Sequence, residues 1–312
     1  MLSSVCRDAG IKPAGAYNSA VMHTPTATTL EAMDYLRQSS ADCIVSIGGG
    51  SVIGLGKALS IRTGLPHLCI PTTFSGSEMT PILGETDKGE KATRSDPKIL
   101  PATVIYDVDL TMTLPTAICV TSGVNAMAHA IEALYAANTT PIITLMALEG
   151  IKALTEALSQ IVSNSASKDA RERALYGAWL CGICLGNTGM GIHHKLCHML
   201  GGSYGLPHSE THTILLPHSL AYNAPAIPRQ IELLTPLFPD SGGDPVQGLN
   251  LLLERVGAPR ALRDFGLKQS DIDDATEKAM RARYPNPREL HVDALRELLR
   301  KAWAGEPAVM ST

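Results

Sequence analysis

Roughly the first 110 residues alternate short apolar, β-branched runs with segments of helical periodicity, and this alternation constrains the fold more than any other feature. Alternating strands and helices are typical of a parallel sheet flanked by helices. The expected strands cover residues 15–22, 42–47, 67–70 and 102–106, and the expected helices cover 28–38 and the stretch after the second strand up to 62.

Beyond residue 112 every long segment has helical periodicity, interrupted by Gly or Pro. We therefore predict a small α/β domain over residues 1–112, followed by an all-α catalytic domain over residues 113–312. The expected helices of the second domain include 142–162, 168–185, a histidine-rich helix that Gly201-Gly202 ends, 219–222, 245–256, 269–280 and 292–303, with a polar loop at 239–243.

A triple glycine followed by serine, Gly48 to Ser51, lies between the second expected strand and the next helix. Glycine lets backbone N–H groups approach a phosphate at the positive end of a helix, so this turn predicts a pyrophosphate site. The alternative is a tight turn with no ligand. The loop Pro71 to Glu78 follows the next strand at the same sheet edge, where open α/β sheets bind ligands, and carries several hydroxyl groups. Those hydroxyls are alternatively caps of the loop itself.

Histidines are concentrated between Met190 and His218, which hold six of the chain's ten. His194 and His198 are four residues apart in an apolar run, so on a helix they share one face. A short loop is expected to bring His208 back toward them. Any one of these histidines is alternatively a buried, hydrogen-bonded core residue.

Asn125 and His129 repeat the four-residue spacing on an earlier expected helix, so two helices can direct four ligand atoms to one point. Three imidazoles and one oxygen suit a divalent transition metal such as Fe or Zn. A neutral amide binds such a cation more weakly than a carboxylate would, so metal-bound and metal-free pockets both stay open. The motif is no HExxH site, because lysine follows the first histidine. The expected metal-ligand set is Asn125, His129, His194 and His208.

The formal net charge of −4 shows no electrostatic footprint for nucleic acid or an anionic membrane, so a small-molecule substrate is favoured. The N-terminal segment resembles no secretory leader and no apolar run is long enough to cross a bilayer, which predicts a cytoplasmic protein. Seven cysteines lack framework spacing. The Cys181 and Cys184 pair lies in an apolar helix and is interpreted as core packing rather than a redox or zinc site.

Five motifs in this order give the chain a family resemblance: GGGS, PTTFSGSE, SGVNAMAHAIEALY, GIHHKLCH and PHSETHTILLPH. Together with the tail motif YPNPR at Tyr284 to Arg288, they make the chain similar to the iron-containing alcohol dehydrogenase superfamily, and within it to maleylacetate reductases. The resemblance implies a dinucleotide-binding α/β domain before an all-helical domain, the architecture shared with dehydroquinate synthase. It also implies a cytoplasmic homodimer and the NADH- or NADPH-dependent reduction of maleylacetate to 3-oxoadipate, a step of aromatic-ring degradation.

The resemblance also assigns roles to residues. By motif, the pyrophosphate would lie on Gly48, Gly49, Gly50 and Ser51, and the ribose and nicotinamide on Thr72, Thr73 and Ser77. The substrate would lie among Asn125, His129, His194 and His208, with His198 as a nearby proton source. A dicarboxylate also requires cations, and the candidates are Lys91, Lys195, Arg283 and Arg288, each of which is alternatively a solvated surface charge.

The chain also departs from the family pattern. Relatives begin with a β-hairpin and a strand-helix unit before the segment matching Leu2, so we expect a truncated parallel sheet. Lys91 to Asp96 and Ala102 also lack basic residues that are frequent in the family. A reductase is the first hypothesis. The second is a redox-neutral isomerase, lyase or cyclase that uses the histidine pocket for acid-base chemistry, and the third is a non-catalytic subunit that dimerises through an exposed sheet edge.

Overall fold

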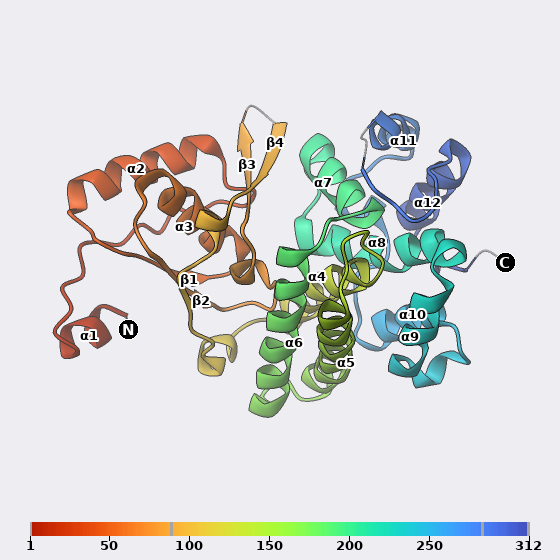
Figure 1. The fold of residues 1–312 in the computed structure, drawn as a ribbon, viewed down its shortest axis with the longest axis horizontal. Helices are drawn as coiled ribbons and strands as arrows, with labels where there is room; N and C mark the ends of the chain where they lie inside the picture. The colour runs from red at the N-terminus through yellow and green to blue at the C-terminus, as the bar shows by residue number, and fades with distance from the viewer. Residues whose placement is uncertain (1, 88–89, 282–283, 311–312) are drawn as a thin grey trace. The chain divides into compact units, whose positions relative to one another are not determined.

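The computed structural model describes residues 2–87, 90–281 and 284–310 (Figure 1). The chain forms two compact units. The sheet unit comprises Met1–Pro71 and Pro81–Ile105, and the helical unit comprises Thr72–Thr80 and Tyr106–Thr312. The break at residues 105 and 106 lies near the boundary expected at 112, but the loop 72–80, expected in the first domain, belongs with the helices.

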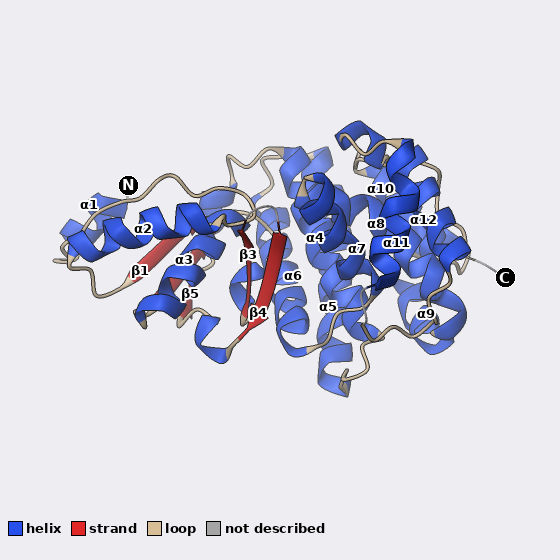
Figure 2. Ribbon diagram, turned by 90° about the horizontal axis from the view of Figure 1, so that it is seen from above, coloured by secondary structure: helices blue, strands red, loops and turns tan. Residues whose placement is uncertain are grey.

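The sheet unit contains a three-stranded parallel sheet in the order β1-β2-β5, drawn in red in Figure 2. Residue Ile44 pairs with His67, and Cys69 pairs with Val104, so the carboxyl ends of β1 and β2 meet at one edge. The small parallel sheet and the expected α/β class are confirmed. The elements of the sheet are β1 (Ile44–Gly48), β2 (His67–Pro71) and β5 (Thr103–Val104).

The expected strand at 15–22 is wrong. These residues form no regular structure. Tyr17 and Ala20 pack against the apolar side chains of α2 and α3, but Val21 and Met22 are 48% and 47% exposed. The backbone N–H of Ala16 instead donates to the hydroxyl of Tyr35 on α2. The helices of this unit are α1 (Leu2–Asp8), α2 (Thr26–Ser39) and α3 (Gly50–Thr63).

An antiparallel hairpin that the sequence did not predict forms from β3 (Ile82–Asp87) and β4 (Glu90–Ser95). Helix α3 supports it, because the buried ammonium of Lys57 donates to the carbonyl of Ile82 at 3.1 Å. The same helix packs tightly on the sheet at Gly56. A Cβ there would lie 2.2 Å from Ser46 Oγ and 2.3 Å from His67 Nε2, so the helix and strands approach as closely as they do only because this residue is glycine.

The helical unit is built around α4, which carries a continuous run of buried residues from Cys119 to Leu134. Helix α4 is long and apolar enough to cross a membrane, but 89% of that stretch is buried inside the protein, as expected of a core helix. Helices α5 and α6 pack against it and share its apolar core. The helices are α4 (Thr116–Leu134), α5 (Pro141–Ser163), α6 (Lys168–Asn187), α7 (Ile192–Tyr204), α8 (His208–Asn223), α9 (Pro228–Leu234), α10 (Pro245–Arg255), α11 (Ile272–Arg281) and α12 (Val292–Ala304).

Two local expectations change here and one is confirmed. Gly201-Gly202 does not end the histidine-rich helix. Helix α7 continues to Tyr204 and ends at Gly205, whose φ of 69° is the left-handed conformation that favours glycine. The expected helix at 219–222 is the last part of α8.

Cys181 and Cys184 are free and buried in α6. Burial raises the pKa of Cys184 to about 12. Both are therefore core residues, as predicted.

Candidate functional site

Helix α4 presents a row of polar side chains with unsatisfied atoms. Thr121, Asn125 and His129 are spaced by four residues, so they lie on one face of the helix. Thr121 Oγ1, Asn125 Oδ1 and His129 Nδ1 are buried, and none has a hydrogen-bond partner among the described residues. Buried polar atoms are normally paired within the protein. These three atoms are therefore candidates for contacts with a bound molecule.

Helix α7 places a histidine beside this row and holds it by a carboxylate. His194 Nδ1 lies 2.5 Å from an oxygen of Glu132, and the other oxygen of Glu132 accepts the backbone N–H of His193 at 2.8 Å. The carboxylate is 1% exposed. It therefore stabilises a proton on Nδ1 and leaves Nε2, which is buried and without a partner among the described residues, as the reactive nitrogen.

Helix α8 adds two more histidines one turn apart, His208 and His212, whose ring centroids are 4.4 Å apart. His212 lies 4.9 Å from the ring of His194, and His194 lies 5.1 Å from His129. His198 lies within 6.2 Å of both His194 and His208. With His193 they form what we call the histidine cluster: His129, His193, His194, His198, His208 and His212.

Three members of the cluster are neutral near pH 7. Burial, and then the neighbouring imidazoles, lower the pKa of His129, His193 and His212 well below the usual value of 6.5. Each ring therefore carries one proton and offers one donor and one acceptor. Such rings can donate a hydrogen bond to a developing negative charge without adding a fixed positive charge to the site.

The loop 72–80 is hydrogen-bonded to α4 and packs against α6, both in its own unit. The backbone N–H of Phe74 donates to Ser122 on α4, and Gly76 fits against α6 so closely that a Cβ would lie 2.9 Å from the carbonyl oxygen of Ala178. Two hydroxyls of this loop, Thr73 Oγ1 and Ser75 Oγ, are buried without a partner among the described residues. Thr73 therefore has the free hydroxyl expected of a ligand contact.

The glycine turn, Gly48 to Ser51, lies in the sheet unit at the carboxyl end of β1. A Cβ on Gly48 would lie 2.6 Å from the side chain of Val52, and the φ of Gly48 is 156°. Gly49 caps α3 without a side-chain hydrogen bond. The N–H groups of Val52 and Ile53 donate to the carbonyl of Gly49. The N–H groups of Gly50 and Ser51 before them have no acceptor within the helix, so they can face an anion.

Two segments of the chain match one protein family. Residues 1–108 match "Iron-containing alcohol dehydrogenase", and residues 119–303 match "Fe-containing alcohol dehydrogenase family, C-terminal". The chain belongs to the iron-containing alcohol dehydrogenase family. It is 50% identical to the maleylacetate reductase of Rhizobium sp. (strain MTP-10005) over 94% of this chain and 82% of that protein. It is 49% identical to the maleylacetate reductase of Pseudomonas knackmussii over 94% of this chain and 83% of that protein.

Solved structures agree with this assignment. The maleylacetate reductase of Rhizobium sp. strain MTP-10005 superimposes with a TM-score of 0.91 at 48% identity, covering 98% of this chain and 86% of that one. A 1,3-propanediol oxidoreductase superimposes with a TM-score of 0.89 at 25% identity, covering 95% of this chain and 86% of that one. The chain is therefore an oxidoreductase in the maleylacetate reductase branch of the family, as the sequence motifs predicted.

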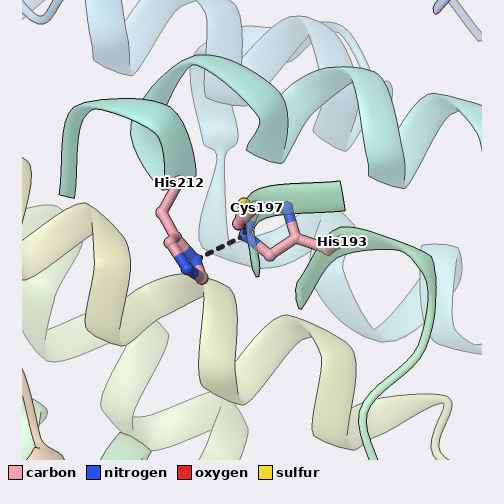
Figure 3. A group of neighbouring side chains, drawn as sticks. All are labelled: His193, Cys197 and His212. Atoms are coloured by element: carbon pink, nitrogen blue, oxygen red, sulfur yellow. Dashed lines mark hydrogen bonds between the residues drawn. The ribbon is translucent and has the colours of Figure 1, made fainter. Parts of the chain in front are cut away.

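The histidines predicted as metal ligands are not gathered at one point among the described residues. Among the described histidine, cysteine and acidic residues, the group that brings its ligand atoms within 4.8 Å of one another is His193, Cys197 and His212 (Figure 3). The predicted His129, His194 and His208 do not form such a group. In that group His193 Nε2 and His212 Nδ1 are 2.9 Å apart and share a proton in a hydrogen bond, which leaves no lone pair for a cation on one of the two nitrogens. The predicted oxygen ligand is the neutral amide of Asn125, which binds a divalent cation more weakly than a carboxylate would.

The candidate cations for the substrate have different surroundings. Lys195 is exposed on α7. Arg288 donates to the carbonyl of Tyr222 at 2.9 Å and lies 4.7 Å from the centre of that ring, so it stabilises the packing of the chain's tail. The side chain of Lys91 and the whole of Arg283 lie outside the described residues. The roles of these four residues in substrate binding stay predictions.

The sequence analysis missed four residues of the site: Thr121, Glu132, His193 and His212. A signal existed for two of them. Thr121 lies four residues before Asn125, and Glu132 lies three residues after His129, so both share the face of the helix that carries the predicted ligands. The other two lie in the histidine-rich segment 190–218, but the sequence did not show that they contact each other, because they lie on different helices.

Proposed function

We propose that this oxidoreductase reduces the carbon–carbon double bond of maleylacetate with NADH or NADPH and forms 3-oxoadipate. When bound, the nicotinamide supplies the hydride, which adds to the alkene carbon farther from the ketone. The electron pair of the double bond then passes to the ketone oxygen as an enolate, and a proton added to the other alkene carbon restores the ketone. The reaction consumes one cofactor and one proton for each substrate.

The observation that supports this proposal most directly is the set of buried imidazole nitrogens in the histidine cluster, His129 Nδ1, His194 Nε2 and His212 Nε2, that have no hydrogen-bond partner among the described residues. An enolate oxygen requires hydrogen-bond donors aimed at it, and the neutral imidazoles of the cluster can supply them. The protonation step requires an acid within reach. Glu132 holds the Nδ1 proton of His194, so the proton consumed in the reaction would be taken up at Nε2 of His194 and passed from there to the substrate carbon.

Cofactor binding is supported by separate features. The glycine turn exposes the N–H groups of α3 to an anion, which suits a pyrophosphate. Thr73 has an unpaired buried hydroxyl that suits a ribose or carboxamide contact. Thr72 and Ser77 stay predictions for the same role, as do the homodimer and the cytoplasmic location.

The test begins with a titration of the purified chain with NADH and with NADPH, followed by nicotinamide fluorescence. Binding of one of the two at micromolar concentration and oxidation of that cofactor at 340 nm only when maleylacetate is present would support the proposal. No binding up to millimolar cofactor would overturn it. Consumption of maleylacetate without oxidation of the cofactor would favour the redox-neutral alternative, which about 50% identity to reductases disfavours.

A further inference from the structure

A line of three buried side chains leads from the core into the histidine cluster. Ser219 Oγ lies 3.3 Å from His193 Nδ1, and His193 Nε2 lies 2.9 Å from His212 Nδ1. The exposed fractions of Ser219, His193 and His212 are 0%, 1% and 0%. Figure 3 shows the bond between the two rings, with His193 on α7 and His212 on α8. Each link joins one donor to one acceptor, so the protons on the line must all point the same way.

The direction follows from the requirement that buried polar groups be paired. If the Ser219 hydroxyl donates to His193 Nδ1, then His193 donates from Nε2 to His212 Nδ1, and His212 carries its own proton on Nε2. In the opposite direction the Ser219 hydroxyl proton, fully buried, would have no acceptor among the described residues. The first arrangement leaves only His212 Nε2 unpaired, whereas the second leaves both His212 Nε2 and the Ser219 hydroxyl proton unpaired. The first is therefore more stable.

The single unpaired group is His212 Nε2, a buried atom without a partner among the described residues. The His212 ring lies 4.9 Å from His194, 4.4 Å from His208 and 6.3 Å from His129, measured between ring centroids. The end of the line is therefore a donor at fixed orientation, in the same cluster as the predicted substrate contacts.

We propose that His212 is a further catalytic residue, whose Nε2–H donates a hydrogen bond to the substrate oxygen that becomes negatively charged on hydride transfer. Ser219 and His193 are positioning residues that hold His212 in this tautomer. This inference rests on the proposed function. A preformed donor is effective because the protein has already oriented it before the charge develops.

The test of catalysis compares His212→Leu with His212→Gln. Leucine removes the donor at similar volume, and we expect kcat with maleylacetate to fall by about 100-fold to 1,000-fold, as on loss of an oxyanion donor, with the Kd for NADH unchanged. Glutamine places an amide N–H near the former Nε2 and should recover part of the loss. His218→Gln, a buried histidine on the same helix but outside the cluster, is the control and should keep the wild-type kcat.

The test of positioning uses the tautomer itself. In protein labelled with ¹⁵N-histidine, two-bond proton–nitrogen correlations should show His212 protonated at Nε2, and Ser219→Ala should convert this signal to a mixture of tautomers and lower kcat by about tenfold. His212 protonated at Nδ1 in the wild type would overturn the proposal. So would a zinc titration that displaces the His193–His212 proton at micromolar metal, because the three side chains would then be a metal site.

The outcomes separate this inference from the proposed function. A wild-type chain that reduces maleylacetate, with a folded His212→Leu variant within threefold of it, would overturn the role of His212 alone. A wild-type chain that does not reduce maleylacetate would remove both the proposed function and the catalytic role, while the tautomer measurement would still decide the positioning of His212.

Discussion

The glycine turn and the histidine cluster are candidate binding sites that are built from different parts of the chain. The glycine turn uses four consecutive residues and presents backbone N–H groups at the start of one helix. The histidine cluster uses side chains from α4, α7 and α8, and its nitrogens are oriented by partners such as Glu132 and Ser219. A site made of backbone N–H groups requires that no side chain blocks the approach of the ligand. A site made of side chains requires further residues that orient those side chains by hydrogen bonds. Substitutions should therefore affect binding at the first and catalysis at the second.

The largest effect is expected for His194→Leu. Loss of the nitrogen that Glu132 orients should lower kcat with maleylacetate by about 100-fold to 10,000-fold, the range for a general acid or base. The Kd for NADH should not change. Stopped assays over hours would measure the residual rate, and His291→Gln, at an exposed histidine, serves as the control. A His194→Leu variant with near wild-type kcat would contradict the assignment of catalysis to the histidine cluster.

Glu132→Gln should have the next largest effect. The amide retains the shape of the side chain, but it cannot accept both the His194 Nδ1 proton and the His193 backbone N–H with a full negative charge. We expect kcat to fall by about 10-fold to 100-fold, as for other orienting partners, with little change in KM. Glu149→Gln on α5 is the matched control. A change confined to KM or to the melting temperature would show that Glu132 does not orient His194.

Gly48→Ala should affect binding alone. The added Cβ would lie 2.6 Å from Val52, so the turn must shift, and the Kd for NADH should rise by about tenfold while kcat at saturating cofactor stays the same. Gly64→Ala is the control at the other end of α3. Its φ of 74° makes the substitution strained, but no atom lies near the new Cβ, so stability should fall without a change in Kd. A lower kcat for Gly48→Ala would contradict the separation of binding from catalysis.

The smallest effect concerns pH. Burial lowers the pKa of His129, His193 and His212 in the folded state, while the unfolded chain takes up protons at these residues below about pH 6.5. The stability that they contribute is therefore complete above pH 6.5 and is lost as the pH falls below it. His212→Leu removes one such group, so the free energy of unfolding should depend less steeply on pH between 6.5 and 5, by at most about 1.4 kcal/mol per pH unit.

Urea unfolding at pH 7, 6 and 5 would measure this slope for the wild type and the variant. His291→Gln again provides the comparison, because it also removes one histidine but lies outside the histidine cluster. Equal slopes for wild type and His212→Leu would show that burial does not lower the pKa of His212 in the folded protein.

The sequence predicted those features that depend on neighbouring residues. The buried strands before Gly48 and Pro71, the glycine turn and the shared faces of α4 and α7 all follow from short patterns, and the structure contains them. Residues 15–22 show the limit of such patterns, because a short apolar run forms a strand only where a neighbouring strand pairs with it. Gly201-Gly202 was interpreted as a helix end, but the helix continues to Gly205, since glycine ends a helix only where the chain adopts the left-handed conformation.

The partners within the site could not be predicted in the same way. His193 and His212 are 19 residues apart and meet only because α7 and α8 pack side by side. Spacing along one helix identifies which side chains share a face, but it does not identify what lies opposite that face. The β3–β4 hairpin was missed for a related reason, since its residues are largely polar and one of its supports is the buried Lys57 from α3.

The loop at residues 72–80 has a practical consequence for cutting the chain into pieces. The chain leaves the sheet unit after Pro71, returns at Pro81 and leaves again after Ile105, so no single cut separates the two units. A gene fragment that starts at Tyr106 would encode α6 without the loop whose Gly76 lies against Gly182, and would uncover that glycine surface. Split-protein complementation or segmental labelling of this enzyme must therefore rejoin three junctions.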